Sequence, residues 1–177
     1  MKKALTFILV FSVILCITVS AKENIEKNAE VVVEVLTNDY DEEYIKNIEF
    51  DDGTKVGDYN YVIKYAEKVT RDPVYINYYF TAAMWITRDG VVSLSLAPTQ
   101  RVRDSATLRE SGWNLLKNPS IGQGGSAHWP KTTDAQNCFY WQYLCHWEFA
   151  NTKEYWNIEP SRTASNYTSV ILHGCNP

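Results

Sequence analysis

The chain contains no dense run of basic side chains, and this absence argues against recognition of nucleic acid by charge alone. The signatures of a zinc hydrolase, His-Glu-x-x-His, and of a serine hydrolase, Gly-x-Ser-x-Gly, are also absent. Its histidines, His128, His146 and His173, have no short ligand spacing. The glycines from Gly122 to Gly125 are not followed by the lysine of a phosphate-binding loop. We therefore expect no metal ion and no cofactor.

The chain has one long apolar run, over residues 4–19, and it lies at the amino terminus. Lys2 and Lys3 precede this run, and the small side chains that signal peptidase requires follow it, ending at Ala21. As a helix the run would measure about 24 Å, which is short for a hydrocarbon core of roughly 30 Å. We predict a signal peptide over residues 1–21, cleaved after Ala21, and a secreted or extracytoplasmic protein without a transmembrane span. A membrane anchor is the alternative.

Charge divides the rest of the chain into two parts. Residues 22–58 carry 12 acidic and 4 basic side chains, whereas residues 59–177 carry 9 acidic and 11 basic ones. Turn sequences at Asp51-Asp52-Gly53 and Gly57-Asp58 lie near the change. We predict an acidic leader or propeptide-like segment over residues 22–58 and a folded domain over residues 59–177. The leader would either keep the chain soluble or cover the rest of it.

Hydrophobic periodicity favours strands in the first half of this domain. Residues 23–50 fit a helix or a strand equally well, because their valines alternate as well as recurring at helical spacing. Period-two patterns begin at Tyr59, and a second extended run covers residues 74–87. Asp89-Gly90 then separates that run from residues 91–96, which predicts a hairpin.

Helices are predicted in the second half. Residues 107–117 begin with a capping box, and residues 135–150 form an apolar pattern with Asp134 as the expected N-cap. A glycine-rich loop over residues 118–134 separates them, and residues 167–172 read as a last strand. The prediction is an α+β fold with a small antiparallel sheet, two or three helices and one disulfide.

Three cysteines remain after signal cleavage, so one of them must stay unpaired within the chain. Cys138 and Cys145 would lie about 10.5 Å apart on one helix, beyond the roughly 7 Å limit for a disulfide. Cys175 must therefore form the bridge. Spacing alone does not choose its partner, and the remaining cysteine is either buried and free or bridged to another molecule.

Several short motifs in the last 95 residues or so occur in a particular order. They are Arg88-Asp89-Gly90, Ser93-Leu94-Ser95, Pro98-Thr99, Trp113, Gln142-Tyr-Leu-Cys145-His146, Lys153, Trp156-Asn157-Ile158-Glu159-Pro160, Arg162 and Cys175-Asn176-Pro177. This combination resembles the secreted bacterial family known as domain of unknown function twenty-five ninety-nine.

The resemblance implies a bacterial extracytoplasmic domain and favours the pairing of Cys145 with Cys175, because those two cysteines match the family pattern. Cys138 lies outside the pattern. Ser161 departs from it, since relatives carry a tryptophan there, and a binding surface built on that ring is not expected in this chain. The resemblance implies no established activity.

One group of side chains could support catalysis. His146, Glu159, Arg162 and Lys153 would supply a proton acceptor and two cations, which metal-free cleavage of a phosphodiester requires. His146 could instead pack at the end of an aromatic helix while the charged residues form structural ion pairs.

A second group would support binding. Trp129 follows the glycine-rich loop beside His128, and Trp156 lies in the carboxyl-terminal motif. Flat rings next to polar groups suit stacking on sugars or anchoring of a protein contact. Core packing is the alternative for each tryptophan.

These observations favour a secreted binding module of the cell envelope or the extracellular space that uses exposed aromatic residues. The partner would be a cell-wall glycan or an extracellular protein. The alternative is a secreted hydrolase or nuclease-like effector using His146, Glu159 and Arg162. The alternative requires these three side chains to lie within hydrogen-bonding reach at the floor of one open cleft.

Overall fold

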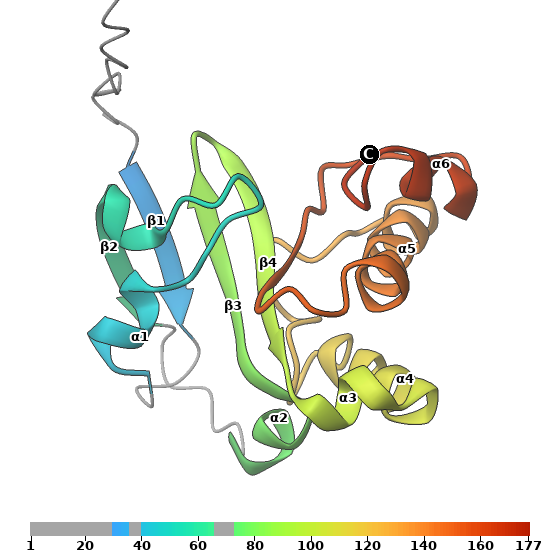
Figure 1. Ribbon diagram of the computed structural model, residues 1–177, viewed down its shortest axis with the longest axis horizontal. Coiled ribbons are helices and arrows are strands. Elements are labelled where there is room, and N and C mark those ends of the chain that lie inside the picture. The colour runs from blue at the N-terminus through green and yellow to red at the C-terminus, as the bar shows by residue number, and fades with distance from the viewer. Residues whose placement is uncertain (1–29, 36–39, 66–72) are drawn as a thin grey trace, which may run out of the picture.

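The computed structural model describes residues 30–35, 40–65 and 73–177. The predicted signal peptide over residues 1–21 lies outside the described residues, and so do residues 22–29. Five strands form one sheet in the order β2-β1-β3-β4-β5 (Figure 1). The strands are β1 (Glu30–Val35), β2 (Asn60–Tyr65), β3 (Phe80–Arg88), β4 (Val91–Pro98) and β5 (Trp156–Ile158).

The sheet is mixed rather than wholly antiparallel. β1 pairs with β2 in parallel, while the pairs β1–β3, β3–β4 and β4–β5 are antiparallel. The connection from β1 to β2 passes through α1 (Glu42–Lys46) and the 3-10 turn η1 (Val56–Asp58), which gives it the length that a parallel pair requires. The α+β class is confirmed.

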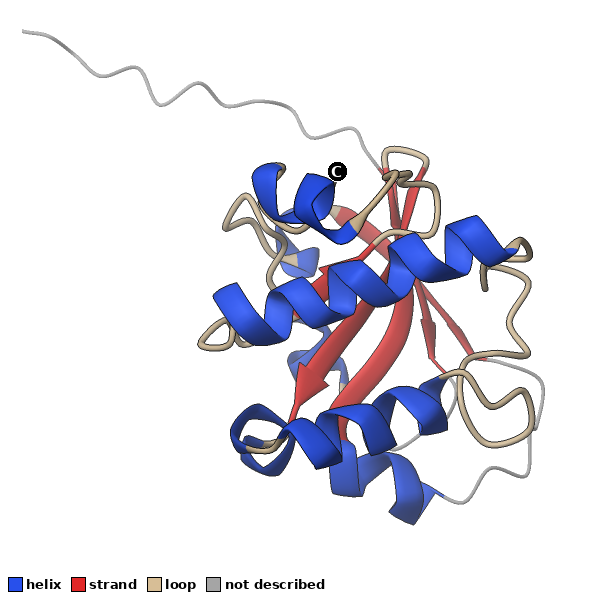
Figure 2. Cartoon of the chain, turned by 90° about the vertical axis from the view of Figure 1, so that its right-hand side faces the viewer, coloured by secondary structure: helices blue, strands red, loops and turns tan. Residues whose placement is uncertain are grey.

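The described residues contain six α-helices instead of the two or three expected. After α1 these are α2 (Pro73–Tyr79), α3 (Gln100–Asp104), α4 (Ala106–Leu116), α5 (Thr133–Phe149) and α6 (Tyr167–Leu172). The longest, α5, lies across the strands (Figure 2). Among the described helices, none is both long enough and apolar enough to span a bilayer.

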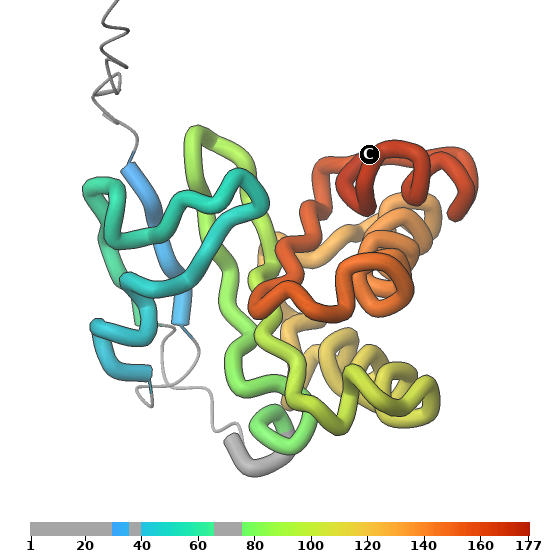
Figure 3. The backbone as a smooth tube through the Cα atoms, in the orientation of Figure 1, coloured from blue at the N-terminus to red at the C-terminus, as the bar shows by residue number. Residues whose placement is uncertain are grey.

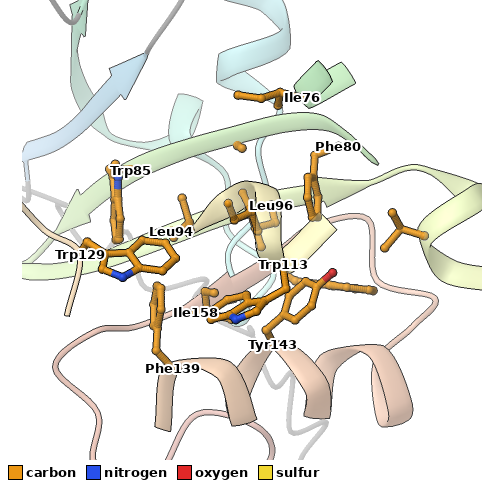
Figure 4. Close-up of a cluster of buried hydrophobic side chains, with 14 residues drawn as sticks. Ile76, Phe80, Trp85, Leu94, Leu96, Trp113, Trp129, Phe139, Tyr143 and Ile158 are labelled. Carbon is orange, nitrogen blue, oxygen red and sulfur yellow. The ribbon is translucent and has the colours of Figure 1, made fainter. Parts of the chain in front are cut away.

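Alternation along β3 sends side chains to two separate cores. Phe80, Ala83 and Trp85 join the core beneath α4 and α5, which contains most of the tryptophans (Figure 4). Met84 and Ile86 face the opposite side of the sheet, where α1 and the segment after it pack. The molecule is therefore layered, with α1 and η1 on one face and α3 to α6 on the other (Figure 1).

The acidic segment contributes directly to the sheet. β1 is the second strand in the order, and its Val31, Val33 and Val35 have no exposed surface. The sequence left helix and strand open over residues 23–50, and in the described part of that range residues 30–35 form a strand and residues 42–46 a short helix. The sheet thus continues across the predicted division at residue 58.

Local signals predicted the central hairpin correctly. Asp89 and Gly90 have φ angles of 52° and 77°, as a two-residue turn with both central residues left-handed requires. The extended run predicted over residues 74–87 is wrong in its first part, because α2 continues to Tyr79. Pro73 occupies the first helical position, where its missing N–H leaves no hydrogen bond unmade.

Both long helices start earlier than their predicted caps. Ser105, rather than Thr107, caps α4, and its hydroxyl accepts a backbone N–H three residues on at 3.2 Å. Thr132, rather than Asp134, caps α5 in the same way at 3.3 Å. In each case a hydroxyl just upstream of the predicted cap satisfies a free N–H of the first turn.

The last predicted strand, residues 167–172, is helix α6. The side-chain carbonyl of Asn166 accepts the N–H of Ser169 at 2.9 Å, and this cap outweighs the β-branched composition. The disulfide between Cys145 and Cys175 is confirmed and fastens the end of the chain to α5. Cys138 is free and buried, and burial raises the pKa of its thiol.

Candidate functional site

The glycine-rich segment between α4 and α5 is anchored on the sheet. Gln123 has no exposed surface, and its Nε2 donates to the carbonyl of Ala83 at 2.7 Å. The backbone N–H groups of Gln123 and Gly124 donate to the carbonyl of Leu116 at 2.6 and 2.9 Å, which satisfies the end of α4. A Cβ at Gly124 would lie 1.9 Å from the carbonyl oxygen of Lys117, so only glycine permits this approach.

This segment brings Trp129 against the two long helices and completes a groove of about 360 Å³, which we call the aromatic groove. Its lining residues are Glu110, Trp113, Asn114, Lys117, Trp129, Gln136, Asn137 and Tyr140. The ring of Trp113 lies 5.6 Å from Trp129 and 5.2 Å from Tyr140, measured between centroids. Figure 4 shows Trp129 above Phe139 of α5, and Trp113 beside Tyr143 of the same helix.

The aromatic groove has a polar rim. Glu110 accepts a hydrogen bond from the hydroxyl of Tyr140 and forms an ion pair with Arg109 at 2.7 Å. Burial, assisted by this carboxylate, raises the pKa of Tyr140 to about 12, so its hydroxyl stays protonated and donates. Exposed Asn114 and Asn137 stand on the two helices that flank the groove.

The predicted binding residues separate in the structure. Trp129 lines the aromatic groove, although it is only 7% exposed. Trp156 has no exposed surface and packs in the core against Tyr143. His128 does not line the groove, and its Nε2 lies 3.2 Å from a carboxylate oxygen of Glu34 on β1.

A smaller pocket of about 150 Å³ opens on the other face of the sheet, beside the β3–β4 hairpin. We call it the hairpin pocket, and it is lined by Phe50, Asp51, Ile86, Arg88, Asp89, Val91, Ser93, Asn157, Glu159 and Arg162. Arg88, Asp89, Ser93, Asn157, Glu159 and Arg162 belong to the sequence motifs that carry the family resemblance. Strands distant in sequence therefore bring these motifs to one place.

The segment between α1 and β2 forms the opposite wall of the hairpin pocket, because it reaches the hairpin (Figure 3). Arg88 pairs with Asp52 of this segment at 2.8 Å, and its guanidinium lies 4.1 Å from the ring centroid of Phe50. Asp51 accepts hydrogen bonds from Lys153 and Asn176, each at 2.7 Å. The acidic segment is thus bound to the carboxyl-terminal motif by charge.

The predicted catalytic residues come together only in part. Glu159 and Arg162 form an ion pair in the hairpin pocket. Lys153 lines a neighbouring pocket of about 100 Å³, which shares Phe50 and Asp51 with the first. Glu159 and Arg162 stand on either side of the turn at Pro160 and Ser161, and the sequence had singled out both as members of the carboxyl-terminal motif.

His146 does not share the hairpin pocket with Glu159 and Arg162. It is 1% exposed, and its Nδ1 lies 2.9 Å from the carbonyl oxygen of Gln142 one turn earlier in α5. Burial lowers the pKa of His146 and outweighs the opposing effects of the hydrogen bond to Gln142 and of the charge on Asp51. The geometric requirement of the hydrolase alternative, three side chains at one open cleft, is therefore not met. Among the described residues, no group of three or more potential ligands is placed to hold a metal ion.

Sequence reasoning missed the roles of Asn157 and Tyr140, and it had singled out Trp113 without its partners. Asn157 lies in the quoted motif, but the sequence does not show that its side chain lines a pocket while that of its neighbour Trp156 is buried in the core. Trp113 and Tyr140 lie on different helices, and only the packing of α4 beside α5 brings their rings together.

Comparison with models of known protein families gives a match. The family model described as "Protein of unknown function (DUF2599)" matches residues 80–177, more than half of the chain. The match begins at the first residue of β3 and includes the whole hairpin. No curated protein and no solved structure matches the chain.

Proposed function

Since the chain belongs to the DUF2599 family, whose description assigns no activity, we propose that it is a secreted bacterial module that binds an uncharged glycan in the aromatic groove. The observation that carries this proposal is the combination of three neighbouring rings with a rim of amides. The faces of aromatic rings pack well against the C–H groups of a sugar, and amide groups can both donate to and accept from its hydroxyls.

The charge of the groove favours a neutral ligand. One carboxylate, Glu110, and one ammonium group, Lys117, line it, and Glu110 is already paired with Arg109. A strongly charged ligand would meet no excess of opposite charge in the groove. The uncharged hydroxyl groups of a glycan, in contrast, can form hydrogen bonds with the side-chain amides that line it.

Secretion is supported by covalent structure as well as by the amino-terminal sequence. The bridge between Cys145 and Cys175 belongs to the class of bonds that persist in oxidising compartments. A protein exported from a bacterium meets cell-wall glycan first, so we propose the cell envelope as its place of action.

The test is titration calorimetry with the protein purified after export, using hexasaccharides of N-acetylglucosamine, of glucose in β-1,4 linkage and of xylose. We expect saturable binding of at least one of them. The double variant Asn114→Ala, Asn137→Ala should bind about tenfold more weakly, because it removes two hydrogen bonds worth about 0.5–1.5 kcal/mol each. Gln100→Ala changes a comparable exposed amide on α3 and should bind as the unchanged protein does.

Two results would contradict the proposal. One is the absence of binding to all three oligosaccharides. The other is equal affinity in the double variant and in the Gln100→Ala control. Release of new reducing ends during the titration would instead favour a hydrolase.

A further inference from the structure

We propose a second ligand site in the hairpin pocket, one that holds a small zwitterion with an ammonium group and a carboxylate, as in a free amino acid. This site lies on the opposite face of the sheet from the aromatic groove and does not depend on glycan binding. Three features carry the inference: an unpaired buried acceptor, a surplus of carboxylates, and a guanidinium at the mouth.

The unpaired acceptor is the side-chain carbonyl of Asn157. This residue is 4% exposed, and its Nδ2 donates to the carbonyl of Glu49 at 3.3 Å. Only the amino side of the amide can donate to that carbonyl, so the orientation of the amide is fixed. Its Oδ1 is buried and has no hydrogen-bond partner within the described part of the chain. A donor in the pocket would satisfy it.

The neighbouring groups favour a cationic donor. Glu159 lies two residues beyond Asn157, just past the end of β5, and lines the same pocket. Three carboxylates line the pocket, on Asp51, Asp89 and Glu159. Asp51 is paired with Lys153 and Glu159 with Arg162, so among the described residues Asp89 is the lining carboxylate that no cation neutralises. An ammonium group offers three donors and a positive charge, whereas a hydroxyl offers a single donor.

A carboxylate fits the other end of the pocket. Arg162 pairs with Glu159 through its Nε, and its side chain is 43% exposed. The terminal amino groups of Arg162 can form the two parallel hydrogen bonds that guanidinium groups make with carboxylates. Arg88 suits this role less well, because its Nη1 already donates to the segment that carries Asp52.

The size of the pocket restricts the ligand. Its volume of about 150 Å³ is below the ~300–1,000 Å³ of pockets for drug-sized molecules. Ile86 and Phe50 supply apolar wall beside the charged groups. A molecule with few heavy atoms, such as glycine or alanine, would span from Asn157 in the interior to Arg162 at the mouth.

The test is nuclear magnetic resonance of the isotope-labelled, exported protein during titration with L-alanine, D-alanine and glycine. We expect saturable shifts of the side-chain amide signals of Asn157 with at least one of them. N-acetylalanine lacks the ammonium group and alaninamide lacks the carboxylate, so each should bind at least tenfold more weakly than alanine.

Variants separate the two ends of the site. Arg162→Gln should weaken alanine about tenfold while leaving alaninamide unchanged, and Asn157→Leu should abolish binding of both. In the Asn157→Leu variant, binding is followed by the backbone amide signals of Ile158 and Glu159. Arg101→Gln, an exposed cation on α3, is the matched control and should change neither. If Asn157→Leu fails to fold, the exposed Arg162→Gln variant still decides the matter.

The proposal is overturned if none of the three amino acids shifts these signals, which would leave water as the occupant of the pocket. It is equally overturned if the two blocked forms bind as tightly as alanine, or if Arg162→Gln binds alanine as the unchanged protein does.

Discussion

Gln142 and Glu159 form a reciprocal pair of hydrogen bonds between a side chain and a backbone. The Nε2 of Gln142 donates to the carbonyl of Glu159 at 2.9 Å, and the N–H of Glu159 donates to the Oε1 of Gln142 at 2.8 Å. Gln142 has no exposed surface, so the pair lies in the interior. The side chain thus acts as a strand neighbour just past the end of β5 and fixes the wall of the hairpin pocket to α5.

We predict that Gln142→Leu lowers the free energy of unfolding by about 2 kcal/mol, because it leaves the backbone N–H and carbonyl of Glu159 without partners. Urea denaturation followed by circular dichroism measures the change. Gln100→Leu, an exposed position on α3, should stay within about 0.5 kcal/mol of the unchanged protein. Equal stability of the two variants would show that water replaces the Gln142 pair at no cost.

Removal of the disulfide should destabilise the protein by about 3–4 kcal/mol, since the bridge closes a loop with a sequence separation of 30 residues. The double variant Cys145→Ser, Cys175→Ser measures this in calorimetry, and reductant should lower the melting temperature of the unchanged protein similarly. Cys138→Ala is the control: it alters a free thiol, so reductant should still lower its melting temperature. If the unchanged protein has the same melting temperature with and without reductant, the prediction is wrong.

His146 should make stability fall at acidic pH. Burial lowers its pKa in the folded state, so below its usual value of about 6.5 the unfolded chain takes up a proton that the folded chain does not. Unfolding is then favoured as pH falls, by at most about 1.4 kcal/mol per pH unit for one group. The unchanged protein should lose stability more steeply below pH 6.5 than His146→Gln does.

Urea midpoints measured at several pH values give both slopes, and titrations of all other groups cancel in their difference. Parallel slopes for the two proteins would mean that His146 binds a proton in the folded state as readily as in the unfolded state.

Gly124→Ala should displace the segment that holds Trp129, because the added Cβ would collide with a backbone carbonyl. We expect a loss of about 2 kcal/mol or more in unfolding free energy and weaker glycan binding, measured by urea denaturation and calorimetry. Ser120→Ala, at an exposed position in the same segment, should alter neither quantity. If Gly124→Ala binds the glycan with unchanged affinity, the aromatic groove is not the glycan-binding site.

Sequence predicted best those features whose cause is local. Asp89-Gly90 dictates its own turn, and the disulfide pairing followed from a family pattern of short motifs. The α6 helix was missed because a single capping side chain, Asn166, decided against a β-branched composition. The placement of β1 could not be predicted, since the alternating valines of residues 31–35 fit any buried strand, and only long-range pairing with β3 selects its position.

The candidate site divides in the same way. Glu159 and Arg162 are near neighbours in sequence, and their ion pair is the structural arrangement that the sequence left open as the alternative to catalysis. His146 lies on the same helix as exposed residues, and its burial depends on how α5 packs, which the sequence alone does not give. The burial of Trp156 likewise depends on the pairing of β5 with β4. A strand of three residues is too short for this pairing to be predicted from sequence.

The position of β1 has a practical consequence for work on the family region. A fragment beginning at Phe80 would lack β1, so β3 would become an edge strand with unpaired backbone N–H and C=O groups. The apolar side chains of Met84 and Ile86 would lie beside that exposed edge. Exposed edge strands pair with strands of other molecules, so the fragment should self-associate and precipitate. Preparations that retain everything from residue 30 onward avoid this, and they also keep the acidic wall without which the hairpin pocket would be half open.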